Sequence, residues 1–120
     1  MAVAVVKKLF TLVTHINLHP QADIGPGMLI PHVGPIQVYP WATIGADCAI
    51  HHVCTIGAGS KPGGPVIGDH VAIGCHSCVL GPVHVGDGAK IGAGAVVVTD
   101  VPAWSTAVGV PARVVKVVRH

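Results

Sequence analysis

A six-residue repeat runs through most of this chain and restricts its fold more than any other feature. Written in sixes from Ala22, the sequence forms twelve hexads, with two extra residues at 34–35 and five more at 60–64. Gly holds the fourth position in seven of the twelve hexads, and Ile or Val holds the third position in all of them. These third-position residues are Ile24, Ile30, Val38, Ile44, Ile50, Ile56, Ile67, Ile73, Val79, Val85, Ile91 and Val97. One further hexad fits upstream, with Leu18 in the same place.

A period of six excludes an α-helix, whose faces recur every 3.6 residues. It suits a short strand followed by a turn, because branched residues favour extended backbone and Gly and Pro favour corners. Three such units close a triangular coil, and stacked coils bury one another's aliphatic residues. An ordinary sandwich of short strands is the alternative, but it would not keep one position aliphatic through every hexad. We therefore predict an all-β parallel β-helix of about four coils over residues 16–100, with an inserted loop at 60–64. A short helix is predicted over 1–15 and a C-terminal extension over 101–120.

The bulk composition excludes several classes of partner. The net charge is only +2 with histidine neutral, so we expect no nucleic acid. No apolar run approaches the ~20 residues of a membrane span, so we expect no membrane contact. Only Cys75 and Cys78 have the spacing of a metal or redox pair, and no second pair accompanies them. Free thiols and a cytoplasmic location follow as expectations.

Stacking of the coils predicts a column of residues on one edge of the helix. With three hexads per coil, His32, His52, Cys75 and Ala93 occupy equivalent turn positions and point outward, about 4.8 Å apart per step. His32 is a candidate general base, since histidine titrates near neutral pH. A metal site of His32, His52 and Cys75 is the second hypothesis, but its end members lie roughly 10 Å apart, too far for one zinc ion. The third hypothesis is that these histidines are turn residues without a role, which is the interpretation for His76 and the remaining histidines. We expect no metal.

Two cysteines have a different explanation. Cys48 and Cys54 occupy the first position of their hexads, where small inward-facing residues are expected. We interpret them as core packing.

The chain resembles the hexapeptide-repeat acyltransferases, and most closely serine O-acetyltransferase and its short relatives, from about Ile16 to Val115. The segments that carry the resemblance are INLHPQADIGPGMLIPH, CTIG, VAIGC, AKIGAGAVVVTDVP and AVGVPARVV. The resemblance implies a left-handed coil, a homotrimer, and acetyl-CoA as the acyl donor in a groove between two subunits. It implies no metal cofactor.

The resemblance also assigns roles to residues. His32 closes the motif GMLIPH and becomes the general base, while Asn17 stands where the family has an Asp that orients this histidine. Pro31 and His52 are the positions expected beside the small-molecule hydroxyl acceptor. Lys90 and Arg113 are candidates for the CoA phosphates, since cations suit phosphate oxygens. The residues expected along the pantetheine arm are Gly57, Ala58, Gly74, Cys75 and Ala93.

Three departures from the family pattern concern the acceptor. Asn17 and Pro31 replace expected aspartates, and Gly63–Gly64 replace an expected Arg-His pair. The losses remove groups that would stabilise an imidazolium or bind the carboxylate and amine of serine. We predict an acetyl-CoA-dependent O-acetyltransferase, similar to serine acetyltransferase, with direct transfer to a hydroxyl of a small acceptor and His32 as general base. The alternatives are a sugar or polysaccharide-precursor O-acetyltransferase, a non-catalytic trimeric scaffold, and a metal-dependent hydratase on the same fold.

Overall fold

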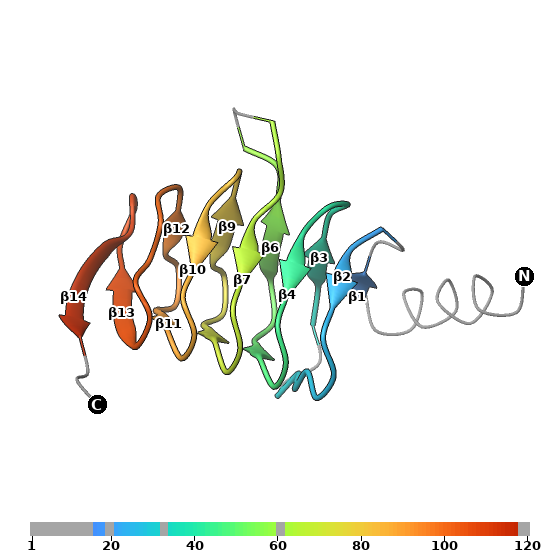
Figure 1. Ribbon diagram of the computed structural model, residues 1–120, viewed down its shortest axis with the longest axis horizontal. Helices are drawn as coiled ribbons and strands as arrows, with labels where there is room; N and C mark the ends of the chain where they lie inside the picture. The colour runs from blue at the N-terminus through green and yellow to red at the C-terminus, as the bar shows by residue number, and fades with distance from the viewer. Residues whose placement is uncertain (1–15, 19–20, 32–33, 60–61, 118–120) are drawn as a thin grey trace, which may run out of the picture.

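Three sheets of very short strands build the molecule. The computed structural model describes residues 16–18, 21–31, 34–59 and 62–117, and the helix predicted for 1–15 lies outside these residues. Figure 1 shows the strands following one another along a long axis, in an envelope of 45 × 29 × 23 Å. Within the described ranges, none of the secondary structure is a helix of the length and apolarity needed to cross a membrane.

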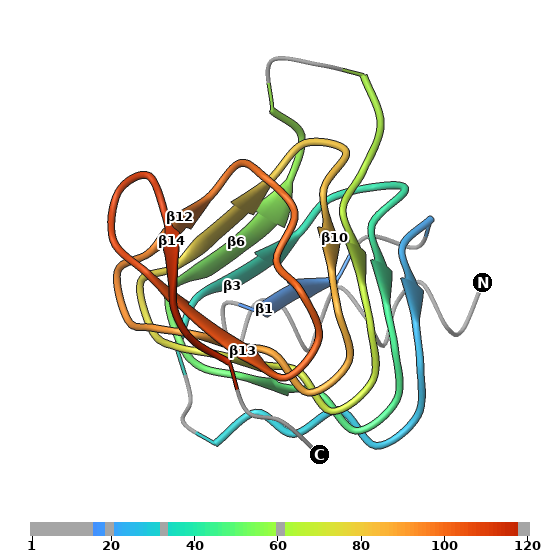
Figure 2. The same cartoon turned by 60° about the vertical axis from the view of Figure 1, so that its left-hand side comes forward.

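The strands of successive coils pair in parallel, as the hexad repeat predicts. The first sheet contains β1 (Ile16–Leu18), β3 (Ile36–Val38), β6 (Cys54–Gly57), β9 (Cys78–Leu80) and β12 (Val96–Val97). The second contains β2 (Asp23–Ile24), β4 (Thr43–Ile44), β7 (Val66–Ile67) and β10 (His84–Val85). The third contains β5 (Ala49–Ile50), β8 (Ala72–Ile73), β11 (Lys90–Ile91), β13 (Ser105–Val108) and β14 (Arg113–Val117). Figure 2 shows these sheets surrounding a common interior, which makes the fold a parallel β-helix.

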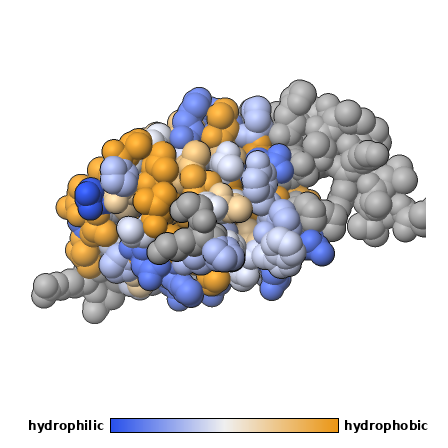
Figure 3. Space-filling model, turned by 90° about the horizontal axis from the view of Figure 1, so that it is seen from above, coloured by the Kyte–Doolittle hydropathy of each residue, from blue (hydrophilic) through white to orange (hydrophobic). Residues whose placement is uncertain are grey.

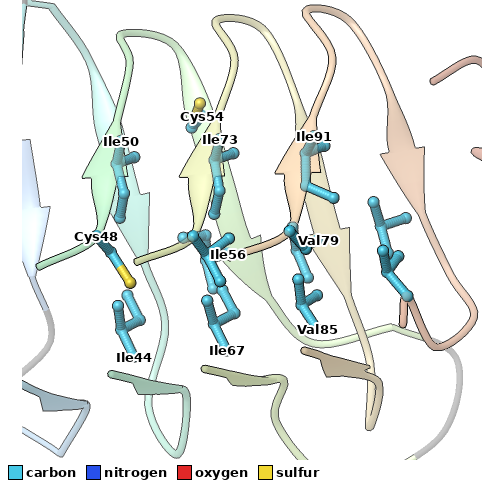
Figure 4. Packing of buried hydrophobic residues seen from close by; sticks show 14 of the residues in the cluster. Ile44, Cys48, Ile50, Cys54, Ile56, Ile67, Ile73, Val79, Val85 and Ile91 are labelled. Carbon is cyan, nitrogen blue, oxygen red and sulfur yellow. The ribbon is translucent and has the colours of Figure 1, made fainter. Parts of the chain in front are cut away.

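The third position of each hexad points into this interior. Ile50, Ile73 and Ile91 lie opposite one another across β5, β8 and β11 and form one of the internal ladders (Figure 4). The predicted third-position residues from Val38 to Val97 are all at most 3% exposed. Ile24 and Ile30, in the first described coil, are only half-buried. The repeat therefore identified the core correctly.

The first position of the hexad also faces inward, and it holds residues of varied size, from Ser77 and Ala89 to Ile36 and Val71. Cys48 and Cys54 are at most 2% exposed, which confirms their interpretation as packing residues. The Cys48 thiol donates to the Gly68 carbonyl at 3.1 Å, and the Cys54 thiol donates to the Gly74 carbonyl at 3.0 Å. Burial raises the pKa of both thiols, because a thiolate is poorly solvated there. All four cysteines are free.

The coil continues beyond residue 100, into the segment predicted as a C-terminal extension. Val101 bridges to Val85 in parallel, and β13 pairs in parallel with β11. The hexad frame does not extend into this coil for two reasons. The turn at its first corner is two residues shorter than a regular hexad requires, and Ser105 and Ala107 occupy inward-facing positions. Neither has the branched side chain that marks the repeat elsewhere. Among the strands of the described residues, only β14 reverses direction, pairing antiparallel with β13.

Three corners join the sheets, and each is a stack of turns. The first corner leads from the first sheet to the second and contains residues 39–42, 58–59 and 62–65, 81–83 and 98–100. The second corner contains residues 45–48, 68–71 and 86–89, and the third contains 51–53, 74–77 and 92–95. The described candidate site residues fall on the first and third corners, on the third sheet and, for Asn17 and Gly57, on the first sheet.

Candidate functional site

The third corner carries the predicted column. Its described members are His52, Cys75 and Ala93, which follow the aligned strands β5, β8 and β11. Main-chain hydrogen bonds connect the turns: the His76 amide donates to the His52 carbonyl at 3.1 Å, and the Gly94 amide donates to the Cys75 carbonyl at 2.9 Å. His52 and Cys75 are half-buried, and Ala93 is exposed. The column is thus a partly accessible edge of the β-helix.

His32, the predicted base, lies outside the described residues. The chain just before it is described: Leu29 bridges to Ala49, and the Ile50 amide donates to the Leu29 carbonyl at 3.0 Å. Pro31 follows and is exposed. Asn17 pairs through its backbone with Gln37, in the first sheet.

The His52 side chain is held on two sides. A Cβ added to Gly34 would lie 2.5 Å from the His52 Cβ, so the backbone of Gly34 packs directly against this histidine. On the other side the His76 ring contacts the His52 ring edge to face, with centroids 5.7 Å apart and planes at 77°. The neighbouring His51 turns elsewhere, and its Nδ1 lies 3.0 Å from the Ile73 carbonyl oxygen. Of the two adjacent histidines, His52 is the one that joins the column.

A cluster at this corner was not expected from the hexad frame. His52, Cys75 and His76 each present a potential ligand atom, and these three atoms lie within 4.8 Å of one another. The frame assigns no role to His76, because it compares only residues at the same position of each hexad. The sequence signal for this cluster is the Cys75–His76 dipeptide, which follows His52 by one coil.

The residues expected along the pantetheine arm are divided between two corners. Gly74, Cys75 and Ala93 lie at the third corner, whereas Gly57 ends β6 on the first sheet and Ala58 follows it at the first corner. Gly57 is buried, and a Cβ there would lie 2.6 Å from the Tyr39 ring. Within one chain these five residues do not line a single groove.

The first corner holds a pocket of about 380 Å³ beside the inserted loop. It is lined by Tyr39, Pro40, Trp41, Ala58, Gly59, Pro62 and Gly63. Among the described residues its lining includes no charged side chain, and Trp41 is 70% exposed. The Gly63–Gly64 pair, where an Arg-His pair was expected, therefore leaves an apolar and aromatic surface.

The two candidate cations lie on different parts of the third sheet. Lys90 begins β11 and faces a pocket of about 330 Å³ that also includes Lys116 and Trp104. Arg113 begins β14, is exposed, and follows Ala112, whose amide donates to the Val96 carbonyl at 2.9 Å. Arg113 thus lies near the third corner, and the structure does not bring it together with Lys90.

Comparison with known proteins identifies the repeat and its relatives. Residues 64–99 match the family described as bacterial transferase hexapeptide (six repeats). The serine acetyltransferase of Escherichia coli strain K12 is 45% identical over 103 residues, which cover 83% of this chain and 38% of that protein.

Solved structures agree with the sequence comparison. A soybean serine acetyltransferase complexed with serine has a TM-score of 0.86 and 42% identity, covering 93% of this chain and 47% of the other. A serine acetyltransferase in complex with CoA also has a TM-score of 0.86, with 35% identity, covering 93% of this chain and 47% of the other. The chain therefore carries hexapeptide repeats of the bacterial transferase kind and is related to the serine acetyltransferases, and it spans less than half the length of the three named above.

Proposed function

We propose that this chain is an acetyl-CoA-dependent O-acetyltransferase that acts on a hydroxyl of a small acceptor. The observation that carries the proposal is its similarity, in both sequence and fold, to serine acetyltransferases that include one complexed with CoA and one complexed with serine. The partly accessible third corner, with small residues at Gly74, Cys75 and Ala93, supports a site for a long, thin cofactor.

His32 acts as the general base in this proposal. Its imidazole removes the acceptor hydroxyl proton as the oxygen attacks the thioester carbonyl of acetyl-CoA. The tetrahedral intermediate then expels the CoA thiolate, and the imidazolium returns the proton to it, so the products are the O-acetyl ester and free CoA. Turn N–H groups or Asn17 stabilise the oxyanion. No acyl-enzyme is required, because the acetyl group passes directly from sulfur to oxygen.

The groove forms between two subunits of a homotrimer in this proposal, and the coil is left-handed with about four turns. The support is that the residues expected along the pantetheine arm lie at two different corners of one chain. In a trimer, Gly57 and Ala58 of one subunit would face Cys75 and Ala93 at the third corner of its neighbour. Exposed apolar side chains give further support, because seven of the twelve large ones among the described residues lie from Val98 to Val117. Figure 3 shows apolar residues gathered toward the C-terminal end. A surface of this kind favours association.

The acceptor is an uncharged alcohol, such as a sugar hydroxyl, rather than free serine. The pocket beside the inserted loop supports this choice, since its described lining is aromatic and apolar. Free serine brings a carboxylate and an ammonium, which need charged or strongly polar partners when they leave water. The four free thiols are consistent with a cytoplasmic location, which we propose with the activity.

Turnover of acetyl-CoA against a panel of acceptors tests the function. Release of CoA, followed by mass spectrometry, is measured with serine, other hydroxy amino acids, and neutral sugars. We expect turnover with at least one neutral alcohol and loss of more than about 100-fold in the His32→Ala variant, the range that general-base catalysis contributes. The matched control is His84→Ala, since His84 is exposed on β10, on the second sheet. Unchanged turnover in His32→Ala would refute the assignment of the base.

Binding of CoA separates this enzyme from a non-catalytic scaffold. A ligand held by the native state raises the melting temperature. We expect millimolar CoA to raise it, and light scattering to give three chains per particle. Absence of any thermal shift, together with absence of turnover, would favour the scaffold.

A further inference from the structure

We propose that His52, Cys75 and His76 form a binding site for a single divalent transition-metal ion, and that the ion bound under physiological conditions is Zn²⁺. The three side chains lie at the third corner and come from two successive coils. Their potential ligand atoms all lie within 4.8 Å of one another. His52 and Cys75 also belong to the column proposed to hold acetyl-CoA, but ion binding by the three residues does not depend on the proposed acetyl transfer.

The distances need only a small adjustment to hold an ion. Three atoms no more than 4.8 Å apart lie within about 2.8 Å of a common point, whereas zinc binds at about 2.0–2.1 Å from nitrogen and about 2.3 Å from sulfur. Inward movements of well under an ångström per atom close this difference. Rotation of the half-buried Cys75 and the exposed His76 side chains supplies such movements without a change of the backbone.

The β-helix places the three residues by main-chain register. β5 pairs with β8, and the His76 amide donates to the His52 carbonyl at 3.1 Å, which fixes one turn against the other. Gly34 packs against the His52 Cβ, and the two imidazoles meet edge to face. The His52 side chain is therefore already restrained, so ion binding costs little of its conformational entropy.

The chemistry of the three donors indicates the metal. Two imidazole nitrogens with one thiolate are the ligands of zinc and of neighbouring late transition metals, whereas calcium and magnesium require oxygen ligands. On binding, the Cys75 thiol loses its proton to solvent, so that the ion is bound by a thiolate. Three protein ligands leave one position of a tetrahedral zinc ion for water or another small ligand, as in catalytic rather than structural zinc sites.

The first experiment uses the wild-type protein and needs no variant. The protein, expressed without a histidine tag, is stripped with a chelator and titrated with Co²⁺, whose thiolate complexes have a charge-transfer band in the near ultraviolet. We expect this band, and we expect equilibrium dialysis with Zn²⁺ to give one ion per chain. Absence of the thiolate band would overturn the proposal, since adventitious binding by surface histidines would not involve Cys75.

Variants then identify the ligands. His76→Asn removes one imidazole while keeping a residue that tolerates the positive φ of 60° at this position. Its matched control is His70→Asn, since His70 is exposed, occupies the same hexad position one turn earlier, and has φ of 57°. Cys75→Ser is paired with Cys78→Ser, at another half-buried free thiol.

The expected result is specific to the cluster. His76→Asn and Cys75→Ser should lower Zn²⁺ affinity by at least about 100-fold, because even outer-shell changes lower it by about 10–100-fold. His70→Asn and Cys78→Ser should bind as the wild type does. Equal Zn²⁺ affinity in the wild type and in His76→Asn or Cys75→Ser would overturn the proposal, whatever the outcome of the acetyl-transfer assays. Circular dichroism of each variant confirms that the fold is retained.

Discussion

The interior ladders lead to a quantitative prediction for the replacement of Ile73 by alanine. Ile73 lies in β8, an interior strand of the third sheet, between Ile50 on one side and Ile91 on the other. It is fully buried, so neither water nor a neighbouring chain can replace the lost contacts. The substitution removes three carbon atoms from a narrow interior that is filled by one aliphatic residue per strand.

The magnitude follows from the transfer and cavity contributions. Three buried carbons at about 0.8 kcal/mol each give about 2.4 kcal/mol for transfer to water. A residual cavity adds about 24 cal/mol per Å³, which brings the expected loss of unfolding free energy to about 3–4 kcal/mol. Ile73→Val removes one carbon and should lower it by only about 1 kcal/mol.

Urea unfolding followed by circular dichroism, at fixed protomer concentration, measures these differences. Fixing the concentration matters because subunit association contributes to apparent stability. The control is Val66→Ala, since Val66 is 39% exposed on β7 and faces away from the interior. A loss below about 1 kcal/mol for Ile73→Ala would refute the reasoning, because transfer alone predicts more than this. So would an equal loss for Val66→Ala with unchanged assembly.

Two further predictions concern the first corner and the buried thiols. A Cβ added at Gly64 would overlap the main-chain carbonyl of Trp41, so Gly64→Ala should lower the unfolding free energy by about 1–3 kcal/mol. Gly59→Ala, whose nearest backbone atom would be 3.2 Å away, should have a smaller effect in the same urea assay, and equal effects would contradict this. Burial raises the pKa of the Cys48 and Cys54 thiols and shields them from reagents, so at a given pH they should be alkylated more slowly than the half-buried Cys75 and Cys78. Peptide mass spectrometry after iodoacetamide treatment measures this, with denatured protein as the control, and equal labelling of all four native thiols would contradict it.

Most of the core could be predicted from the hexad frame alone. An aliphatic residue, such as Ile56, recurs at the third position of every hexad. With a period of six, residues at this position all point to the same side of the coil. The frame also placed Cys48 and Cys54 inside, because the first position of the hexad faces inward. It failed near the C-terminus, where a shortened corner moves Ser105 and Ala107 into the inward positions.

The candidate site was less predictable. Equivalent hexad positions correctly stack His52 above Cys75, whereas the assignment of Gly57 and Cys75 to one groove between two subunits came from the family resemblance. The structure separates these two residues by the length of β6, because the strand carries the chain from the third corner to the first. Light scattering tests whether the chain forms the homotrimer in which a neighbouring subunit would bring Gly57 and Cys75 together.

The amino-acid sequence thus established the periodicity, the inward-facing residues and the stacking of equivalent turns, because these depend on spacing along the chain. Contacts between residues at different hexad positions depend instead on how the backbone of one turn lies against the backbone of the turn in the next coil. His76 meets His52 because its amide hydrogen-bonds to the preceding coil, and the two rings then lie edge to face. A pattern of residue types does not contain that geometry, so the three-residue cluster became visible only in the folded chain.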